Sequence, residues 1–143
     1  KAIVVVVAST ALPLAIVALP EAPPEIGMEI RRAAEVERRV VETVNAMRDR
    51  SLRGEVSSLE YADMLDHEVL PLWIDIRKRL ELVLTQPHAD RKFLSRLIEY
   101  AKCREEGWQL EVEGLREQDS SKIERARDAW EAGEKIAKEL GSR

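Results

Sequence analysis

The 143-residue chain has one cysteine and two histidines, and only 4% of its residues are aromatic. A single cysteine excludes an intramolecular disulfide framework and any zinc site built from several cysteines. The shortage of aromatic residues argues against a β-sandwich or β-barrel. Positive charge is also in deficit, since 23 Lys and Arg stand against 27 Asp and Glu. This excludes a nucleic-acid binder that acts through bulk positive charge, because such binding depends on neutralising many phosphates.

The chain also lacks a recognisable arrangement of catalytic or metal-binding residues. His67 stands beside two carboxylates, but it falls off the apolar stripe of its predicted helix, and His88 falls in a predicted turn. The inward-facing Glu-x-x-His pairs of di-iron helical bundles are missing. Neither Ser9 nor Ser95 has a histidine partner suggested by its spacing. We therefore predict no catalytic, metal-binding or cofactor-binding residue and no cofactor, with His67 as a solvated surface side chain.

An apolar run opens the chain. Residues 2–20 (AIVVVVASTALPLAIVALP) carry no charged side chain. At about 1.5 Å per helical residue, they could cross most of a hydrocarbon core about 30 Å thick. We predict a transmembrane helix at residues 1–20, followed by a Pro-rich linker at residues 21–25. The alternatives are a cleaved signal peptide, which the Pro after Ala18-Leu19 disfavours, and a buried soluble element, which four successive valines favour.

The remaining residues, 26–143, are predicted to form an all-α antiparallel four-helix bundle. From Ile26 to Arg53 the apolar residues are spaced by three, four and seven, as in an amphipathic helix that ends at Gly54. Ser57 and Glu60 form a capping box at the start of the second helix. Pro71 lies within that helix, so a kink or break is expected near residues 67–71.

The third helix is expected to begin at Asp90, and the fourth at a second capping box formed by Ser121 and Glu124. The fourth helix is expected to close at Gly141. Three glycines fall within these helices, where a neighbouring helix could approach closely: Gly107, Gly114 and Gly133. Short turns between the helices favour antiparallel neighbours.

Three tryptophans and the cysteine allow two interpretations each. Trp73, Trp108 and Trp130 fall on the inner faces of three helices, where they are expected to pack in the core rather than form a binding cage. Cys103 is expected to be a half-buried filler. Were it exposed, Lys102 and Arg104 beside it could lower its pKa. The alternating Arg and Glu residues are interpreted as solvated helix faces joined by i,i+4 pairs.

Two stretches of the sequence carry a resemblance to a known family. The first is YADML followed by HEVLPLW, residues 61–65 and 67–73. The second is YAKCREEGW followed by EGLR, residues 100–108 and 113–116. Together they resemble the helical segment after the last membrane span in some bacterial rhomboid-family intramembrane serine proteases. The order of apolar segment, Pro-rich joint and charged helix is similar too.

The resemblance implies a limited amount about activity. Rhomboid-family members cleave transmembrane substrates with a serine in a Gly-x-Ser-x-Gly-like context and a histidine on another span. Neither motif occurs in this chain. No catalytic residue can be carried over, and the expectation is that the catalytic machinery lies upstream of Lys1.

The predicted function is a non-catalytic, membrane-tethered helical bundle, the C-terminal accessory domain of a rhomboid-like protease that positions substrates, binds partners or stabilises the enzyme. The alternative is a standalone membrane-anchored interaction or sensor module of the cell envelope. The predicted partners are membrane lipid, through residues 2–20, and a protein bound to the bundle, with no nucleic acid. The expected location is the bacterial inner membrane, with the bundle outside the cytoplasm, although the flanking charges do not fix the side. The oligomeric state stays open.

Overall fold

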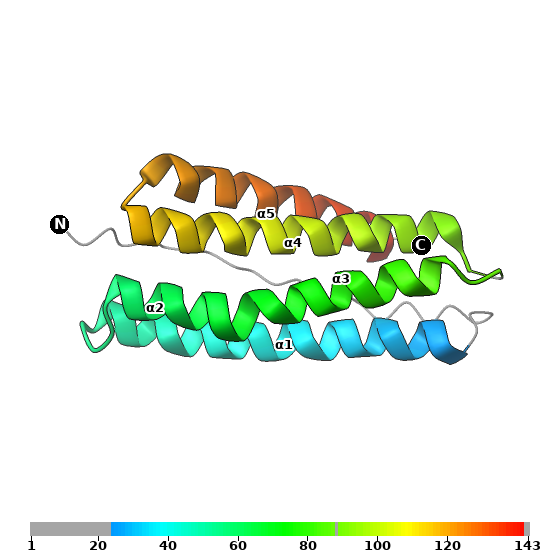
Figure 1. Cartoon of the computed structure of the whole chain (residues 1–143), viewed down its shortest axis with the longest axis horizontal. Helices are drawn as coiled ribbons and strands as arrows, with labels where there is room; N and C mark the ends of the chain where they lie inside the picture. Colours follow the sequence, from blue (N-terminus) through cyan, green and yellow to red (C-terminus); the bar gives the residue numbers. More distant parts are fainter. Residues whose placement is uncertain (1–23, 88, 142–143) are drawn as a thin grey trace.

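The computed structural model describes residues 24–87 and 89–141, and every regular element within them is helical. The elements are α1 (Pro24–Leu52), α2 (Ser58–Met64), η1 (Leu65–Val69), α3 (Leu70–Leu84), α4 (Arg91–Glu117) and α5 (Ser120–Gly141). Helix α2, the π-helical turn η1 and helix α3 follow one another without a break and form one rod, which we call the second rod. The chain thus forms four rods that run in alternating directions (Figure 1). The predicted all-α four-helix bundle is confirmed.

The membrane segment is a separate matter. The transmembrane helix predicted at residues 1–20 lies outside the described residues. Among the helices that the structure describes, none combines the length and the apolar character needed to cross a bilayer.

The ends of α1 and α2 follow local sequence rules. Helix α1 begins at Pro24, so it already includes the last two residues of the predicted linker 21–25. Proline is well tolerated there because the first amides of a helix have no partner within it. After α1, Gly54 adopts a positive φ of 75°, which glycine accepts without strain. The predicted capping box is present: the Glu60 amide donates to Ser57 Oγ at 3.1 Å, and the Ser57 amide donates to Glu60 Oε2 at 2.8 Å.

Pro71 widens the second rod instead of breaking it. The Leu70 amide donates to the Leu65 carbonyl, five residues earlier, which is a π-helical bond. Proline has no amide to donate to the carbonyl of His67, and one wide turn over Leu65–Val69 accommodates that loss. The kink or break expected near residues 67–71 is therefore a π-helical turn, and the helix resumes at Leu70.

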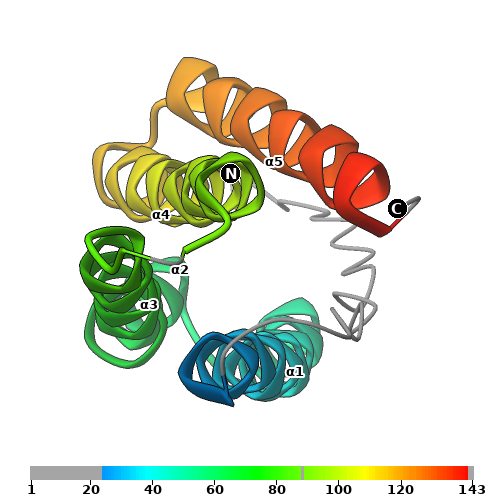
Figure 2. The same ribbon diagram turned by 90° about the vertical axis from the view of Figure 1, so that its right-hand side faces the viewer.

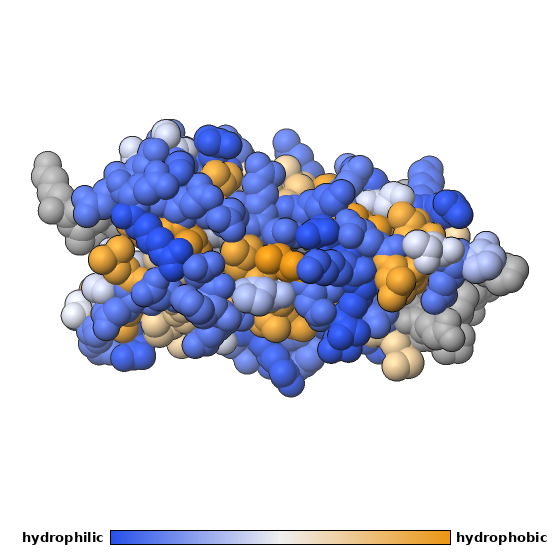
Figure 3. Space-filling view, in the orientation of Figure 1, coloured by the Kyte–Doolittle hydropathy of each residue, from blue (hydrophilic) through white to orange (hydrophobic). Residues whose placement is uncertain are grey.

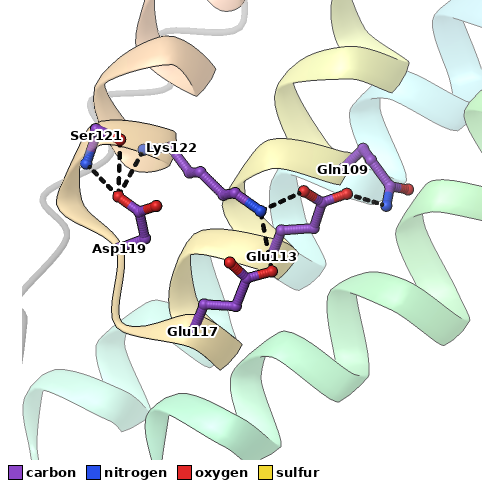
Figure 4. A network of polar contacts seen from close by, with 6 residues as sticks. All are labelled: Gln109, Glu113, Glu117, Asp119, Ser121 and Lys122. Atoms are coloured by element: carbon purple, nitrogen blue, oxygen red, sulfur yellow. Dashed lines mark hydrogen bonds and ion pairs between the residues drawn. The ribbon is translucent and has the colours of Figure 1, made fainter.

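The start of α5 differs from the prediction. The capping box expected from Ser121 and Glu124 is wrong, because α5 already begins at Ser120. Asp119 caps the helix: its Oδ1 accepts from the Ser121 amide at 2.9 Å and from the Lys122 amide at 3.4 Å (Figure 4). A carboxylate one residue before the helix reaches the first free amides more directly than the hydroxyl of Ser121 can.

Helix α4 is the central element. Asp90 caps its start, as predicted: the side chain accepts from the Phe93 amide at 3.0 Å. Buried residues cover most of its circumference. Seen along the rods, α4 lies between α3 and α5, and α1 lies on the other side of α3 (Figure 2).

The glycines bring α4 and α5 together as expected. A Cβ added at Gly107 would lie 2.6 Å from Cδ1 of Trp130, too close for any real contact. A Cβ at Gly114 would lie 2.7 Å from Cδ1 of Ile123, and a Cβ at Gly133 would lie 3.3 Å from Cβ of Cys103. Because these three glycines have no side chain, α4 and α5 can pack at this short separation.

The three tryptophans are all buried, which confirms their placement in the core. Trp108 packs edge-on against Trp130, with ring centroids 5.1 Å apart. Trp73 packs edge-on against Tyr100, with centroids 5.9 Å apart. The three tryptophans therefore form two aromatic pairs in the core, one of them with Tyr100.

Candidate functional site

The structure places few of the residues singled out in the sequence near one another. His67 is exposed, as predicted, and its Nδ1 lies 2.7 Å from the carbonyl oxygen of Asp63 in the preceding turn. Ser95 is exposed on α4. Ser9 and His88 lie outside the described residues. Within the described part of the chain, no three His, Cys, Asp or Glu side chains gather where they could hold a metal ion.

Cys103 is half-buried against Gly133, which agrees with the expected filler role. Burial raises the pKa of its thiol, and the nearby Glu106 raises it further. The charge of Arg104 lowers the pKa, but not enough to offset these effects. Cys103 therefore lacks the lowered pKa of an activated thiol.

Three charged residues lie in the core, and the sequence interpretation missed all of them: Glu37, Arg104 and Glu111. A signal for them was present. On α4 the apolar residues Ala101, Trp108 and Leu115 are seven apart, and Arg104 and Glu111 fill the positions between them in steps of three and four. On α1 the gap of seven between Ala33 and Val40 contains Glu37 in the same way.

The first buried polar cluster joins α1 to α4. The Tyr100 hydroxyl donates to Glu37 Oε1, and Arg104 Nη2 donates to the same oxygen at 3.3 Å. Arg104 Nε also donates to the Tyr100 hydroxyl at 3.1 Å, and its guanidinium carbon lies 5.2 Å from the ring centroid. Burial raises the pKa of Tyr100, so its hydroxyl stays protonated as a donor. Opposite charges thus meet inside the bundle with hydrogen bonds, the condition for keeping an ion pair in a core.

The second cluster surrounds Glu111. This side chain is completely buried, and neither of its carboxyl oxygens has a hydrogen-bond partner among the described residues. Burial raises its pKa to about 8, with a partial offset from the positive charge of Arg48 on α1. The buried hydroxyl of Tyr61 on α2 also lacks a partner among the described residues. Burial raises the pKa of Tyr61, and the charge of Glu111 raises it further.

A carboxyl with this pKa is mostly protonated, and therefore neutral, at pH 7. Keeping a carboxyl neutral avoids the large free-energy cost of an isolated charge in an apolar interior. The group can still take up or release one proton near pH 8, which couples the stability of the bundle to pH. Glu111 shares a raised pKa with active-site acids. It shares no other property with them, because its side chain lies wholly inside the core.

On the surface, many charged residues form ion pairs, either between two helices or within one helix. Figure 4 shows Lys122 of α5 reaching Glu113 and Glu117 of α4, each at 2.9 Å, while Gln109 donates to Glu113 at 2.8 Å. This network closes the hairpin between α4 and α5. The solvated faces predicted from alternating Arg and Glu are also present, for example in the Arg38–Glu42 pair.

Two further ion-pair groups hold the second rod to α4. Arg116 contacts Asp63 at 2.7 Å and Asp66 at 2.8 Å, which ties α4 to α2 and to the π-helical turn. Arg77 of α3 contacts Glu105 of α4 at 2.6 Å. On the face seen in Figure 3, hydrophilic side chains dominate, and hydrophobic ones follow the line between these two rods.

Comparison with models of protein families, with curated proteins and with solved structures gives no match to this chain. The residues that carry the sequence resemblance nevertheless have a clear structural role. Val69, Leu70 and Trp73 of the first stretch are buried, as are Tyr100, Arg104 and Trp108 of the second. The motif residues therefore build the packing of the bundle.

Proposed function

We propose that the chain is a non-catalytic helical bundle held at a membrane by its apolar segment, residues 2–20. The observation that carries the proposal is the junction: a segment without any charge leads within four residues into α1 of a bundle that has its own core. Such a segment has the length and composition of a membrane span. The titratable groups of the bundle interior support a structural role, because Glu37 and Arg104 bond each other and Glu111 is enclosed.

The biological setting we propose first is an accessory domain of a rhomboid-like intramembrane protease, where the bundle positions substrates, binds partners or stabilises the enzyme. Its support is the pair of sequence stretches described above, whose residues pack α4 against the second rod. The alternative is a standalone anchored interaction or sensor module of the cell envelope. The genomic sequence upstream of Lys1 separates the two. Further spans with Gly-x-Ser-x-Gly and a membrane histidine support the protease, and a start codon just before Lys1 refutes it.

The membrane tether can be tested by alkaline extraction of bacterial membranes that contain the full chain with a reporter fused after residue 143. We expect the chain to stay in the membrane pellet. A matched variant with Val6→Arg and Ile16→Arg should move to the soluble fraction, because charges within the hydrocarbon core of a bilayer are costly. Release of the unaltered chain by alkali would refute the tether. A reporter active only outside the cytoplasm would then show the side on which the bundle lies.

A further inference from the structure

One end of the bundle would face the membrane if residues 2–20 cross it. Helix α1 begins at this end, α3 ends there, α4 begins there and α5 ends there (Figure 1). We call it the linker end and define it by residues 24–32, 78–84, 91–93 and 138–141. Three residues, 21–23, separate Pro20 from α1. The four residue-to-residue steps from Pro20 to Pro24 can span at most about 14 Å of extended chain. The linker end would therefore lie within that distance of the bilayer.

The linker end exposes two large hydrophobic side chains. Met28, in the second turn of α1, is 63% exposed, and Leu82, in the last turn of α3, is 69% exposed. These are the highest values among the exposed large hydrophobic residues of the described chain. The opposite end, where α1 is joined to α2, also exposes Leu52 and Leu59, at 56% and 57%. Hydrophobic exposure alone therefore does not distinguish the two ends.

The charges beside these exposed hydrophobic side chains do distinguish the two ends. Arg31 and Arg32 follow Met28 by three and four residues, so they lie one turn behind it on the same exposed face. Arg91 and Lys92 are exposed in the first turn of α4. None of these four cations forms an ion pair with another residue that the structure describes.

Nearby, the acidic side chains that the structure describes are engaged in caps or ion pairs, or are partly buried. Asp90 caps α4, Glu139 pairs with Arg96, and Glu29 is partly buried, 4.0 Å from Arg79. At the opposite end, the cations beside the exposed Leu52 are paired with Glu55. Arg53 contacts Glu55 at 2.6 Å, and Leu59 stands next to Glu60 of the capping box.

We propose that the linker end binds the surface of an anionic lipid bilayer. Met28 and Leu82 enter the boundary between headgroups and acyl chains, while Arg31, Arg32 and the cations of α4 bind lipid phosphates. Exposed apolar side chains flanked by basic ones are the usual pattern of interfacial attachment. The inference rests on the proposed tether, and it adds that the bundle is held against the bilayer instead of swinging freely on the linker.

The test uses the full chain in lipid vesicles, with an environment-sensitive fluorophore on single cysteines. In a C103A background, M28C and L82C report the linker end, and L52C and L59C are controls of similar exposure at the opposite end. The vesicles contain phosphatidylcholine and phosphatidylglycerol, with a nitroxide quencher at headgroup depth. Flotation first establishes that the chain is membrane-bound. We expect several-fold stronger quenching at positions 28 and 82 than at positions 52 and 59.

A charge variant tests the lipid chemistry. R31Q/R32Q should weaken the quenching at position 82 on phosphatidylglycerol vesicles and leave it unchanged on pure phosphatidylcholine. R125Q/R127Q removes the same charge from exposed positions near the start of α5, at the opposite end, and should have no effect. Equal quenching at all four labelled positions, or equal effects of the two charge variants, would overturn the inference while the tether stands. Failure of the unaltered chain to float would overturn both.

Discussion

Replacing Glu111 with glutamine isolates the free energy of the buried carboxyl. In the folded chain Glu111 keeps its proton up to about pH 8, whereas an exposed carboxyl loses it near 4.5. Between these pH values folding takes up a proton at Glu111, so the free energy of unfolding falls as pH rises. The stability linked to this proton is fully present only below about pH 4.5. Each tenfold change in the protonation equilibrium is worth about 1.4 kcal/mol. Between about pH 5 and about pH 7.5, Glu111 should therefore cost the bundle about 3 kcal/mol of stability.

The assay is urea unfolding of the chain without residues 1–20, followed by far-UV circular dichroism across that pH range. E111Q and E111L cannot ionise at this position, so both should lose the decline between about pH 5 and about pH 7.5 that the parent shows. Above about pH 7.5 E111Q should be more stable than the parent. Burial raises the pKa of Tyr61, so its hydroxyl stays protonated throughout this range and does not contribute.

E106Q is the matched control, because Glu106 is an exposed carboxyl on the same helix. It should keep the pH dependence of the parent. Stability of the parent that does not change with pH, or the same slope in the parent and in E111Q, would refute the description of Glu111 as a neutral buried acid.

Three further substitutions test the packing by the same unfolding measurement. G107A should lower stability by about 1–2 kcal/mol despite its better helix propensity, because the new methyl displaces Trp130; a gain in stability would contradict the close approach. W130A should cost about 3–5 kcal/mol, the usual range for emptying a buried aromatic site; an unchanged unfolding curve would place Trp130 at the surface. R104M should cost about 3–5 kcal/mol because it leaves the charge of Glu37 in the core, and the double variant E37M/R104M should recover much of the loss. No recovery would show that the pair itself stabilises the bundle.

Features that depend on neighbouring residues could be predicted from the sequence. The capping box of Ser57 and Glu60, the cap at Asp90 and the glycine that ends α1 all form between residues a few positions apart. The close approach at Gly107 was also predictable, because glycine within a long helix is costly unless a neighbour needs the space. Where local rules competed, as between Asp119 and Ser121, the prediction chose the wrong cap.

The buried polar residues were missed for a different reason. Charged residues were assigned to the solvated faces by type, although the spacing placed Arg104 and Glu111 on the inner stripe of α4. Whether such a position is tolerated depends on a partner from elsewhere in the chain, and Glu37 is 67 residues from Arg104. No local pattern identifies that partner. Including charged residues in the three-and-four spacing, however, would have predicted that Arg104 and Glu111 face the core.

The most direct test of the division into tether and bundle is the unfolding of the chain without residues 1–20. All of α1 to α5 is kept in this fragment, and the core described above is made by residues of these helices. We predict a soluble, strongly helical protein that unfolds in one cooperative transition. Loss of cooperative unfolding would show that the apolar segment belongs to the core and is not a tether.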